Sequence, residues 1–382
     1  MEKNNTILDY IAWRGDLSFS ASPFCDVDAL IFAQLSYLDF SKIVGADFEN
    51  GKTLKDVCEA FCNSADFNER KHLGLVINPL SVDLLLEAGK SARFGGVTLS
   101  GFDFRYNKDA EEQFCALTFS FLDCHFVAFR GTDDTIVGWK EDFNLAFKTI
   151  VPAQADSLLY LMEAKQRVKC KSFYSGGHSK GGNLAIFSAA HLPKSLKKKI
   201  SAVYNFDGPG FLRCELCKGE FKEILSRTRS FFPNGSIIGM LFEHDSHYTT
   251  VLSNGTFIMQ HDPFTWEILG PNFTECEELD KASLFFNLTF NEWFISLEES
   301  KRAEFVETLF SVLEATNAQT NSELAENWIK SAGAILKALA GLDKDIRKSA
   351  IETFGSFFKL AKDGIPSLIR NSDSNKKDLE IE

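Results

Sequence analysis

Residues 175–185 read SGGHSKGGNLA, and the prediction of the fold depends on the serine within them. Ser179 stands between Gly177 and Gly181 and fits the pattern G-x-S-x-G. The pattern has structural meaning only when a strand precedes it and a helix follows it. The residues before it, CKSFYS, predict a strand, and those after it, NLAIFSAAHL, predict a helix. This context favours a tight strand-to-helix turn that presents Ser179 over a glycine-rich loop with an inert hydroxyl.

The pattern around this turn predicts an α/β fold. β-Branched and aromatic runs predict three antiparallel entry strands at 97–106, 113–122 and 125–131. Further elements are expected in this order: a helix at 152–168, a strand at 171–175, a helix at 182–191, and strands at 202–207, 236–243 and 255–260. Strands that alternate with helices of this length predict a mostly parallel central sheet with helices on both faces.

Four segments are expected along the chain. Residues 1–90 are mostly helical by pattern and should pack on the body of the protein, and residues 91–276 form the α/β core. Residues 277–371 form a helical extension whose apolar face we expect to pack on the same body, because acidic residues interleave with its lysines. Residues 372–382 are a short charged tail that we expect to be disordered.

Composition narrows the class of partner and the compartment. The chain has 382 residues, 37 of them phenylalanine, and a net charge of −12. The phenylalanines indicate a well-filled core, the preferred interpretation, or a site for an apolar ligand. The negative net charge disfavours binding to nucleic acid. The start of the sequence lacks the features of a signal peptide, and no apolar run reaches the roughly 18 residues that span a bilayer. The nine scattered cysteines suit free thiols, so we expect a cytoplasmic protein.

Two clusters of ligand-type residues are weak candidates for a metal site. Cys214 and Cys217 form a C-x-x-C, but no second pair or suitably spaced histidines lie nearby. Glu243, His244, Asp245 and His247 include metal-ligand types, yet only alternate residues of a strand share a face. We expect no metal and no cofactor.

A serine hydroxyl is a weak nucleophile near neutral pH, so it needs a base that is oriented by a carboxylate. In the fold that carries this turn, both partners follow the serine along the chain. The later histidines are His191, His244, His247 and His261. His191 ends the helix after the turn, where it can bond the last carbonyls. His261 lies just past a predicted strand on a loop marked by Asp262 and Pro263, and we expect it to be the base.

Two aspartates compete for the role of the acid. Asp245 follows the predicted strand at 236–243 and is the preferred candidate. Asp207 ends the strand after the helix, and its Gly-Pro-Gly context indicates a turn-capping role at least as strongly. Asp207 therefore stays as the alternative.

A tetrahedral intermediate needs hydrogen-bond donors for its oxyanion, each worth about 3 to 4 kcal/mol of barrier. One donor should be the backbone N–H of Lys180, directly after the serine, and the other should come from a loop after an earlier strand. The stretch VAFRGT at 127–132 ends a strand, so Thr132 is the second candidate.

These motifs together resemble a known family. VAFRGT, then Trp139 and Asp142, then GHSKGGNLA, resemble the class 3, fungal-lipase-like branch of the α/β-hydrolases. With YNFDGPGF, SIIGMLFEHDSHYTTV and QHDPFTW, residues 25–320 are similar to a bacterial family of predicted lipases and esterases. The class 3 branch usually carries leucine at the position of Lys180, and a cation there would favour an anionic or polar substrate.

The resemblance implies an α/β-hydrolase fold and the hydrolysis of carboxylic esters through an acyl-enzyme without a cofactor. It implies Ser179 as nucleophile, His261 as base, an acid near Asp245, and Thr132 with Lys180 around the oxyanion. The expected partner is a small-molecule or lipid acyl ester, and transient contact with a membrane surface stays open. The alternatives are a catalytically silent scaffold that binds a ligand or partner, and an acyltransferase or peptidase with the same triad.

Overall fold

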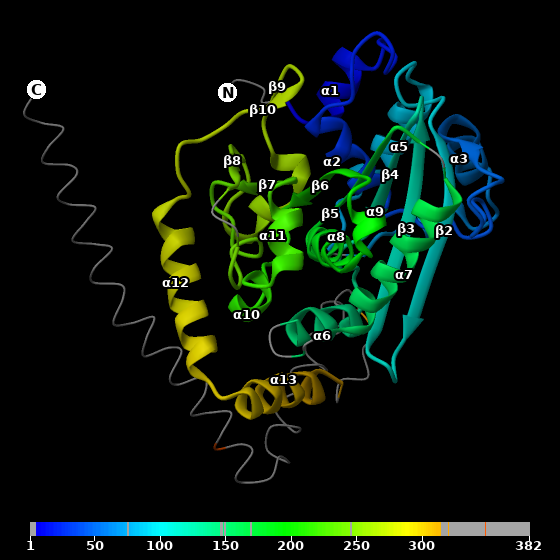
Figure 1. Ribbon diagram of the computed structural model, residues 1–382. Coiled ribbons are helices and arrows are strands. Elements are labelled where there is room, and N and C mark those ends of the chain that lie inside the picture. The colour runs from blue at the N-terminus through cyan, green and yellow to red at the C-terminus, as the bar shows by residue number, and fades with distance from the viewer. Residues whose placement is uncertain are drawn as a thin grey trace, which may run out of the picture.

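The computed structural model describes residues 5–314 apart from 75, 146, 147, 149, 169, 245 and 246, together with residues 320 and 348. In that part of the chain, an eight-stranded sheet runs in the order of the sequence, from β1 to β8 (Figure 1). Its strands are β1 Lys52–Thr53, β2 Thr98–Asn107, β3 Glu112–Phe121, β4 Cys124–Phe129, β5 Ser172–His178, β6 Ile200–Phe206, β7 Thr228–Pro233 and β8 Thr249–Val251. A separate hairpin pairs β9 Ile268–Leu269 with β10 Asn272–Phe273.

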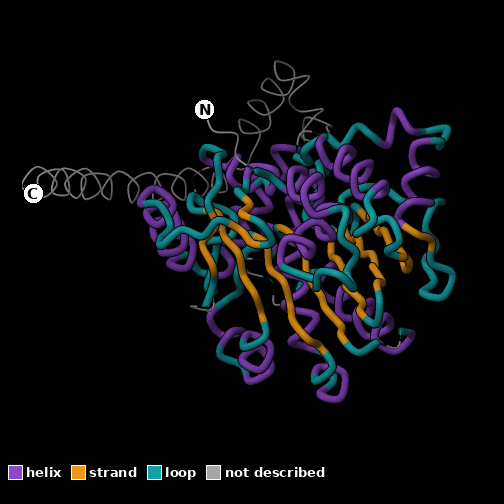
Figure 2. Tube along the Cα trace, turned by 90° about the horizontal axis from the view of Figure 1, so that it is seen from above, coloured by secondary structure: helices purple, strands orange, loops and turns teal. Residues whose placement is uncertain are grey.

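Helices lie on both sides of the sheet (Figure 2). Before the sheet core come α1 Ile7–Arg14, α2 Asp26–Leu35, α3 Leu54–Cys62, α4 Phe67–Arg70 and α5 Leu80–Lys90. Within the core are α6 Ile136–Asn144, α7 Pro152–Arg167, α8 Lys180–His191, α9 Lys194–Lys197, α10 Arg213–Leu216 and α11 Gly219–Leu225. Then follow two 3₁₀ helices, η1 Phe257–His261 and η2 Pro263–Thr265, and finally α12 Lys281–Ser296 and α13 Glu299–Glu314.

The direction of the strands confirms the predicted fold. β2, β3 and β4 are antiparallel neighbours, and β4 through β8 are parallel neighbours. An antiparallel entry that leads into a parallel sheet covered on both faces is the predicted α/β-hydrolase arrangement. The carboxyl ends of β4, β5 and β6 therefore meet at one edge, where sites form in open parallel sheets.

Strand β3 shows why both faces of the sheet need cover. Its side chains alternate between two hydrophobic clusters, because successive residues of a strand point to opposite faces. Leu117 and Phe119 face the cluster that α1, α2 and α5 share, whereas Phe114 and Ala116 face the cluster of α7 and α8. All four side chains are fully buried.

The N-terminal helices supply one of these two layers. Nine of the ten residues of α2 are buried, and Phe32 stacks on Phe119 of β3 at 4.5 Å between ring centroids. A helix that is apolar nearly all round belongs to a core. The phenylalanine-rich composition thus fills the space between this N-terminal layer and the sheet.

Two C-terminal helices lie within the described residues. α12 and α13 begin after residue 277, and Phe310 of α13 packs on Phe143 of α6 at 5.7 Å. The rest of the predicted helical extension, apart from residues 320 and 348, and the predicted tail at 372–382 lie outside the described residues. Among the helices that the structure describes, none has both the length and the apolar character needed to cross a membrane.

Two predicted strands are wrong. Residues 236–243 form turns, with Phe242 in the left-handed region at φ 66°, and η1 takes the place of the strand at 255–260. The actual strands are β7 and β8 on either side. Short apolar runs do not distinguish a strand from a buried turn, and here apolar side chains such as Ile238 line a cavity.

A buried ion pair fastens the N-terminal layer. Arg93 donates to both carboxylate oxygens of Asp28 at 2.8 and 2.5 Å, and both side chains are fully buried. The remaining guanidinium N–H groups donate to the carbonyls of Leu17, Ser22 and Pro23 at 3.0 to 3.1 Å. Loss of one partner of such a pair strongly destabilises the protein, because the other charge stays buried without compensation.

Replacing Asp28 should therefore weaken the fold. Asp28→Asn leaves the buried guanidinium without its counter-charge, and we expect the free energy of unfolding in urea to fall by about 3 to 5 kcal/mol. Asp103→Asn is the matched control, since its partner Arg105 is 43% exposed and the loss should stay below about 1 kcal/mol. Equal losses of unfolding free energy in the two variants would contradict a stabilising role of the buried pair.

Candidate active site

Ser179 lies at the turn between β5 and α8, with φ 58° and ψ −134°. A positive φ outside glycine is strained, and such strain is concentrated at functional sites. Packing holds the turn: a Cβ at Gly181 would lie 2.0 Å from the carbonyl oxygen of Phe129. Glycine thus lets the start of α8 press on the end of β4, while the Ser179 N–H donates to the Phe206 carbonyl at 2.9 Å.

His261 is bonded to an aspartate at the end of the neighbouring strand. Its Nδ1 lies 2.6 Å from Oδ2 of Asp207, a side chain that is fully buried after β6. The other oxygen of Asp207 accepts from the hydroxyl of Ser236 at 2.5 Å. Both carboxylate oxygens thus have partners, and the aspartate fixes the orientation of the imidazole ring.

This geometry changes the choice of acid. Asp245, the preferred candidate, lies outside the described residues. The alternative, Asp207, accepts the hydrogen bond from Nδ1 of His261, and this nitrogen donates only one hydrogen bond. Asn205, rather than Asp207, caps the turn: its Oδ1 accepts from the Gly208 N–H at 3.0 Å. Asp207 is therefore the candidate acid for which the structure gives a bond to His261. The usable signal in the sequence was its place at the end of a parallel strand next to β5.

Ser179 and His261 line one cavity of about 520 Å³. This volume is typical of a site for a small organic molecule. Much of the wall is apolar, with contributions from Val76, Ile77, Pro79, Trp139, Ile238, Met259 and Pro263. The serine is only 8% exposed and the imidazole 20%, so a ligand would meet both groups largely away from bulk water.

The loop after β4 brings Thr132 to the same cavity. A Cβ at Gly131 would lie 3.0 Å from Cβ of Ser179, so the loop touches the serine turn directly. The Thr132 hydroxyl donates to Oδ2 of Asp142 on α6. Burial raises the pKa of Asp142 to about 6, although the Lys180 ammonium and the Thr132 hydroxyl oppose this shift. Thr132 is thus held in place beside Ser179.

Lys180 does not place its charge in the cavity. Its ammonium is fully buried and donates to Oε2 of Glu141 at 2.9 Å and to two oxygens of Gln113 at 2.6 and 2.8 Å. The expectation that this cation favours an anionic substrate is therefore wrong. Only the backbone of Lys180 stays beside the serine, and the first N–H groups of a helix have no partner within the helix.

Three polar side chains of the N-terminal segment also line the cavity, and none of them belongs to a motif predicted from the sequence. Gln34 and Tyr37 come from the end of α2 and the residues after it, and Asn78 precedes α5. No spacing in the sequence connects them to a serine more than 100 residues later. Only the packing of the N-terminal layer against the sheet brings them to the site.

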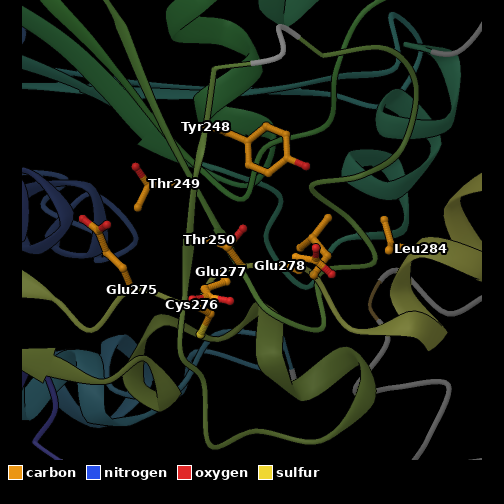
Figure 3. A pocket seen from close by; sticks show the side chains of 9 residues that line it. Tyr248, Thr249, Thr250, Glu275, Cys276, Glu277, Glu278 and Leu284 are labelled. Carbon is orange, nitrogen blue, oxygen red and sulfur yellow. The ribbon is translucent and has the colours of Figure 1, made fainter. Parts of the chain in front are cut away.

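A second cavity of about 510 Å³ lies apart from these groups (Figure 3). It is lined by Tyr248, Thr249, Thr250, Glu275, Cys276, Glu277, Glu278, Leu279 and Leu284. Its lining includes neither the serine turn nor His261. Across the described residues, no three His, Cys, Asp or Glu side chains gather closely enough to hold a metal ion.

Loss of the Lys180 ammonium should cost stability. Lys180→Leu leaves the Glu141 carboxylate buried without its counter-charge, so we expect the free energy of unfolding in urea to drop by about 3 to 5 kcal/mol. Adding Glu141→Gln removes the stranded charge and should recover a large part of that loss. A single variant as stable as the wild type would show that the pair does not form.

Comparison with known proteins identifies the family of the chain. No curated protein matches the chain. Among solved structures, the crystal structure of M37 lipase is similar at 12% identity over 56% of this chain and 68% of that one, with a TM-score of 0.33. At that TM-score the likeness supports no conclusion about this chain, and the resemblance to the class 3 branch stays a resemblance. The model of one family matches residues 88–311, more than half of the sequence, and the chain belongs to the Mbeg1-like family.

Proposed function

We propose that this protein is a serine hydrolase that cleaves carboxylic acyl esters, with Ser179 as nucleophile, His261 as base and Asp207 as acid. The observation that carries the proposal is the bond between His261 and the buried Asp207, at the wall of a cavity that Ser179 also lines. A nucleophile, a base and a group that orients the base are the parts that acyl transfer needs.

The Asp207 bond sets the tautomer of the base. Because a carboxylate only accepts, Nδ1 of His261 carries the proton, and Nε2 keeps the lone pair that can take the proton of Ser179. The serine oxygen attacks the ester carbonyl, and Nε2 passes the proton to the leaving alcohol. Water then attacks the acyl-enzyme with His261 as base again, and this step releases the acid and restores Ser179.

Two backbone N–H groups are assigned to the oxyanion. Lys180 offers the first N–H of α8, and Thr132 offers the N–H of the loop beside the serine. The Thr132 hydroxyl already gives its hydrogen to Asp142, so its role is to hold the loop rather than to bind the oxyanion. The dipole of α8 adds partial positive charge at the same point.

The cavity supports an ester with an apolar part. Seven of its wall residues have apolar side chains, and the transfer of an acyl chain from water to such a surface is favourable. The fixed polar groups gather at the serine turn and the oxyanion loop, which is where a scissile carbonyl would stand. The ester function is therefore expected at Ser179, with its apolar chain against the apolar part of the wall.

Covalent labelling tests the proposal. A fluorophosphonate reacts with serines that a base activates, so the wild type should be labelled and Ser179→Ala should not. Ser175→Ala is the matched control, because this serine lies buried on the same strand and should leave labelling unchanged. An unlabelled wild type would favour the alternative, a silent scaffold that binds a ligand, and a panel of short- to long-chain acyl esters would measure turnover directly.

The assignment of the acid has its own test. In Asp207→Asn the amide donates to Nδ1 of His261 and moves the proton to Nε2, so the labelling rate should fall on the order of 10⁴-fold. Asp245→Asn should change the rate by less than a few-fold. The reverse ranking would return the role to Asp245 and overturn the choice of Asp207.

A further inference from the structure

Side-chain hydrogen bonds link the N-terminal segment to the loop of His261 at two points, once through His178 and once directly. Both contacts come from residues before position 88, outside the part that the family model matches. On the basis of the proposed function, we propose that Tyr37 and Asn78 are positioning residues that set where His261 stands. The N-terminal layer is then a working part of the active site as well as a cover for the sheet.

The first contact runs from Tyr37 through His178 to the backbone of His261. Nε2 of His178 lies 2.8 Å from the His261 carbonyl oxygen, which can only accept, so Nε2 carries the proton. Nδ1 is then an acceptor, and the Tyr37 hydroxyl donates to it at 2.9 Å. The hydroxyl thus favours the one tautomer of His178 that can hold the His261 carbonyl.

His178 can perform this role without opposing catalysis. Its ring lies 4.4 Å from the ring of His261 between centroids, so a second positive charge there would disfavour the imidazolium that forms during the reaction. Burial lowers the pKa of His178 well below its ordinary value, and the neighbouring His261 lowers it further. His178 therefore stays neutral, and its neutral ring supports the loop by hydrogen bonding and contact.

The second contact holds the next residue along the chain. Nδ2 of Asn78 donates to Oδ2 of Asp262 at 2.6 Å, while Oδ1 of Asp262 accepts from the Phe264 N–H at 3.0 Å. Oδ1 of Asn78 accepts from the Leu80 N–H at 2.9 Å, so the amide is itself oriented by the start of α5. The loop is fastened at the carbonyl of one residue and the side chain of the next.

The segment that makes these contacts is anchored in the core. Tyr37 follows α2, whose residues are nearly all buried against the sheet, and its own side chain is 6% exposed. A displacement of about 1 Å at a reacting group can cost about 100-fold in rate. Because the N-terminal layer is fixed in the core, its contacts can keep His261 from being displaced by that distance.

Removing the Tyr37 hydroxyl tests the first contact. In Tyr37→Phe we expect the rate constant of fluorophosphonate labelling and kcat toward a cleaved ester to fall about 10-fold, with KM changed less than 2-fold. The downfield proton NMR signal of the His261 Nδ1–H should shift as well. Tyr160→Phe is the matched control: it removes a buried hydroxyl that bonds Thr118 and Gly101 away from the site, and it should leave all three readouts unchanged.

Substitutions at His178 separate positioning from packing. His178→Gln keeps a donor for the His261 carbonyl and should retain more activity than His178→Leu. In the His178→Leu background, Tyr37→Phe should cause no further loss, because the chain of bonds is already broken. For the second contact, Asn78→Asp sets a carboxylate against Asp262 and should slow labelling about 10-fold, whereas Asn78→Ser, which can still donate, should slow it less.

The outcomes distinguish a failure of the positioning role from a failure of the hydrolase proposal. If the wild type and Tyr37→Phe are labelled equally fast, with thermal unfolding at the same temperature, the positioning role is overturned and the hydrolase proposal stands. Additive losses for Tyr37→Phe and His178→Leu would likewise overturn the chain of bonds. An unlabelled wild type would end both proposals.

Discussion

The buried ion pair between Lys180 and Glu141 sits beneath the candidate site, and much of the site's geometry depends on it. Lys180 begins α8 directly after the serine, and Glu141 lies on α6 next to Asp142, which holds Thr132. Glu141 also accepts from the backbone N–H groups of Gln113 and Ala153, at 3.2 and 2.8 Å. One carboxylate thus joins β3, α6, α7 and α8 and fixes the serine turn relative to the oxyanion loop.

The N-terminal layer gives the sheet its second face and gives the site part of its wall. Phe32 and Phe119 stack within the core, while the same helix ends near Gln34 and Tyr37 in the cavity. Because core packing is dense, a residue at the end of a buried helix is held to a narrow range of positions. Packing of the hydrophobic core therefore also fixes the hydrogen-bonding groups of the site, because α2 contributes to both.

Features that depend on residues close together in the sequence could be predicted from the sequence. The strand and helix around Ser179 agree with β5 and α8 to within a few residues, since periodicity and glycine placement act locally. The strand predicted at 236–243 failed because its apolar residues face inward from turns, where a Cβ at Gly239 would lie 2.0 Å from Oδ1 of Asp207. The pairing of His261 with Asp207 joins residues 54 positions apart. The adjacency of the parallel strands β5 and β6 could indicate that Asp207 lies near Ser179, but His261 ends a 3₁₀ helix, and no pattern in the sequence indicates its partner.

His261 stands at the end of a 3₁₀ turn, and this position explains why so many side chains converge on it. A residue in a regular strand is held by the ladder of backbone bonds, whereas loop residues open at low free energy. A general base must nevertheless keep its nitrogen within hydrogen-bond reach of the reacting hydroxyl. Asp207 at the ring, His178 at the carbonyl and Asn78 at the next side chain supply by side-chain bonds the order that secondary structure supplies elsewhere. Two of these three bonds lead back to Tyr37 and Asn78, which lie before the residues 88–311 that the family model matches, so residues 88–311 alone lack part of what steadies the base.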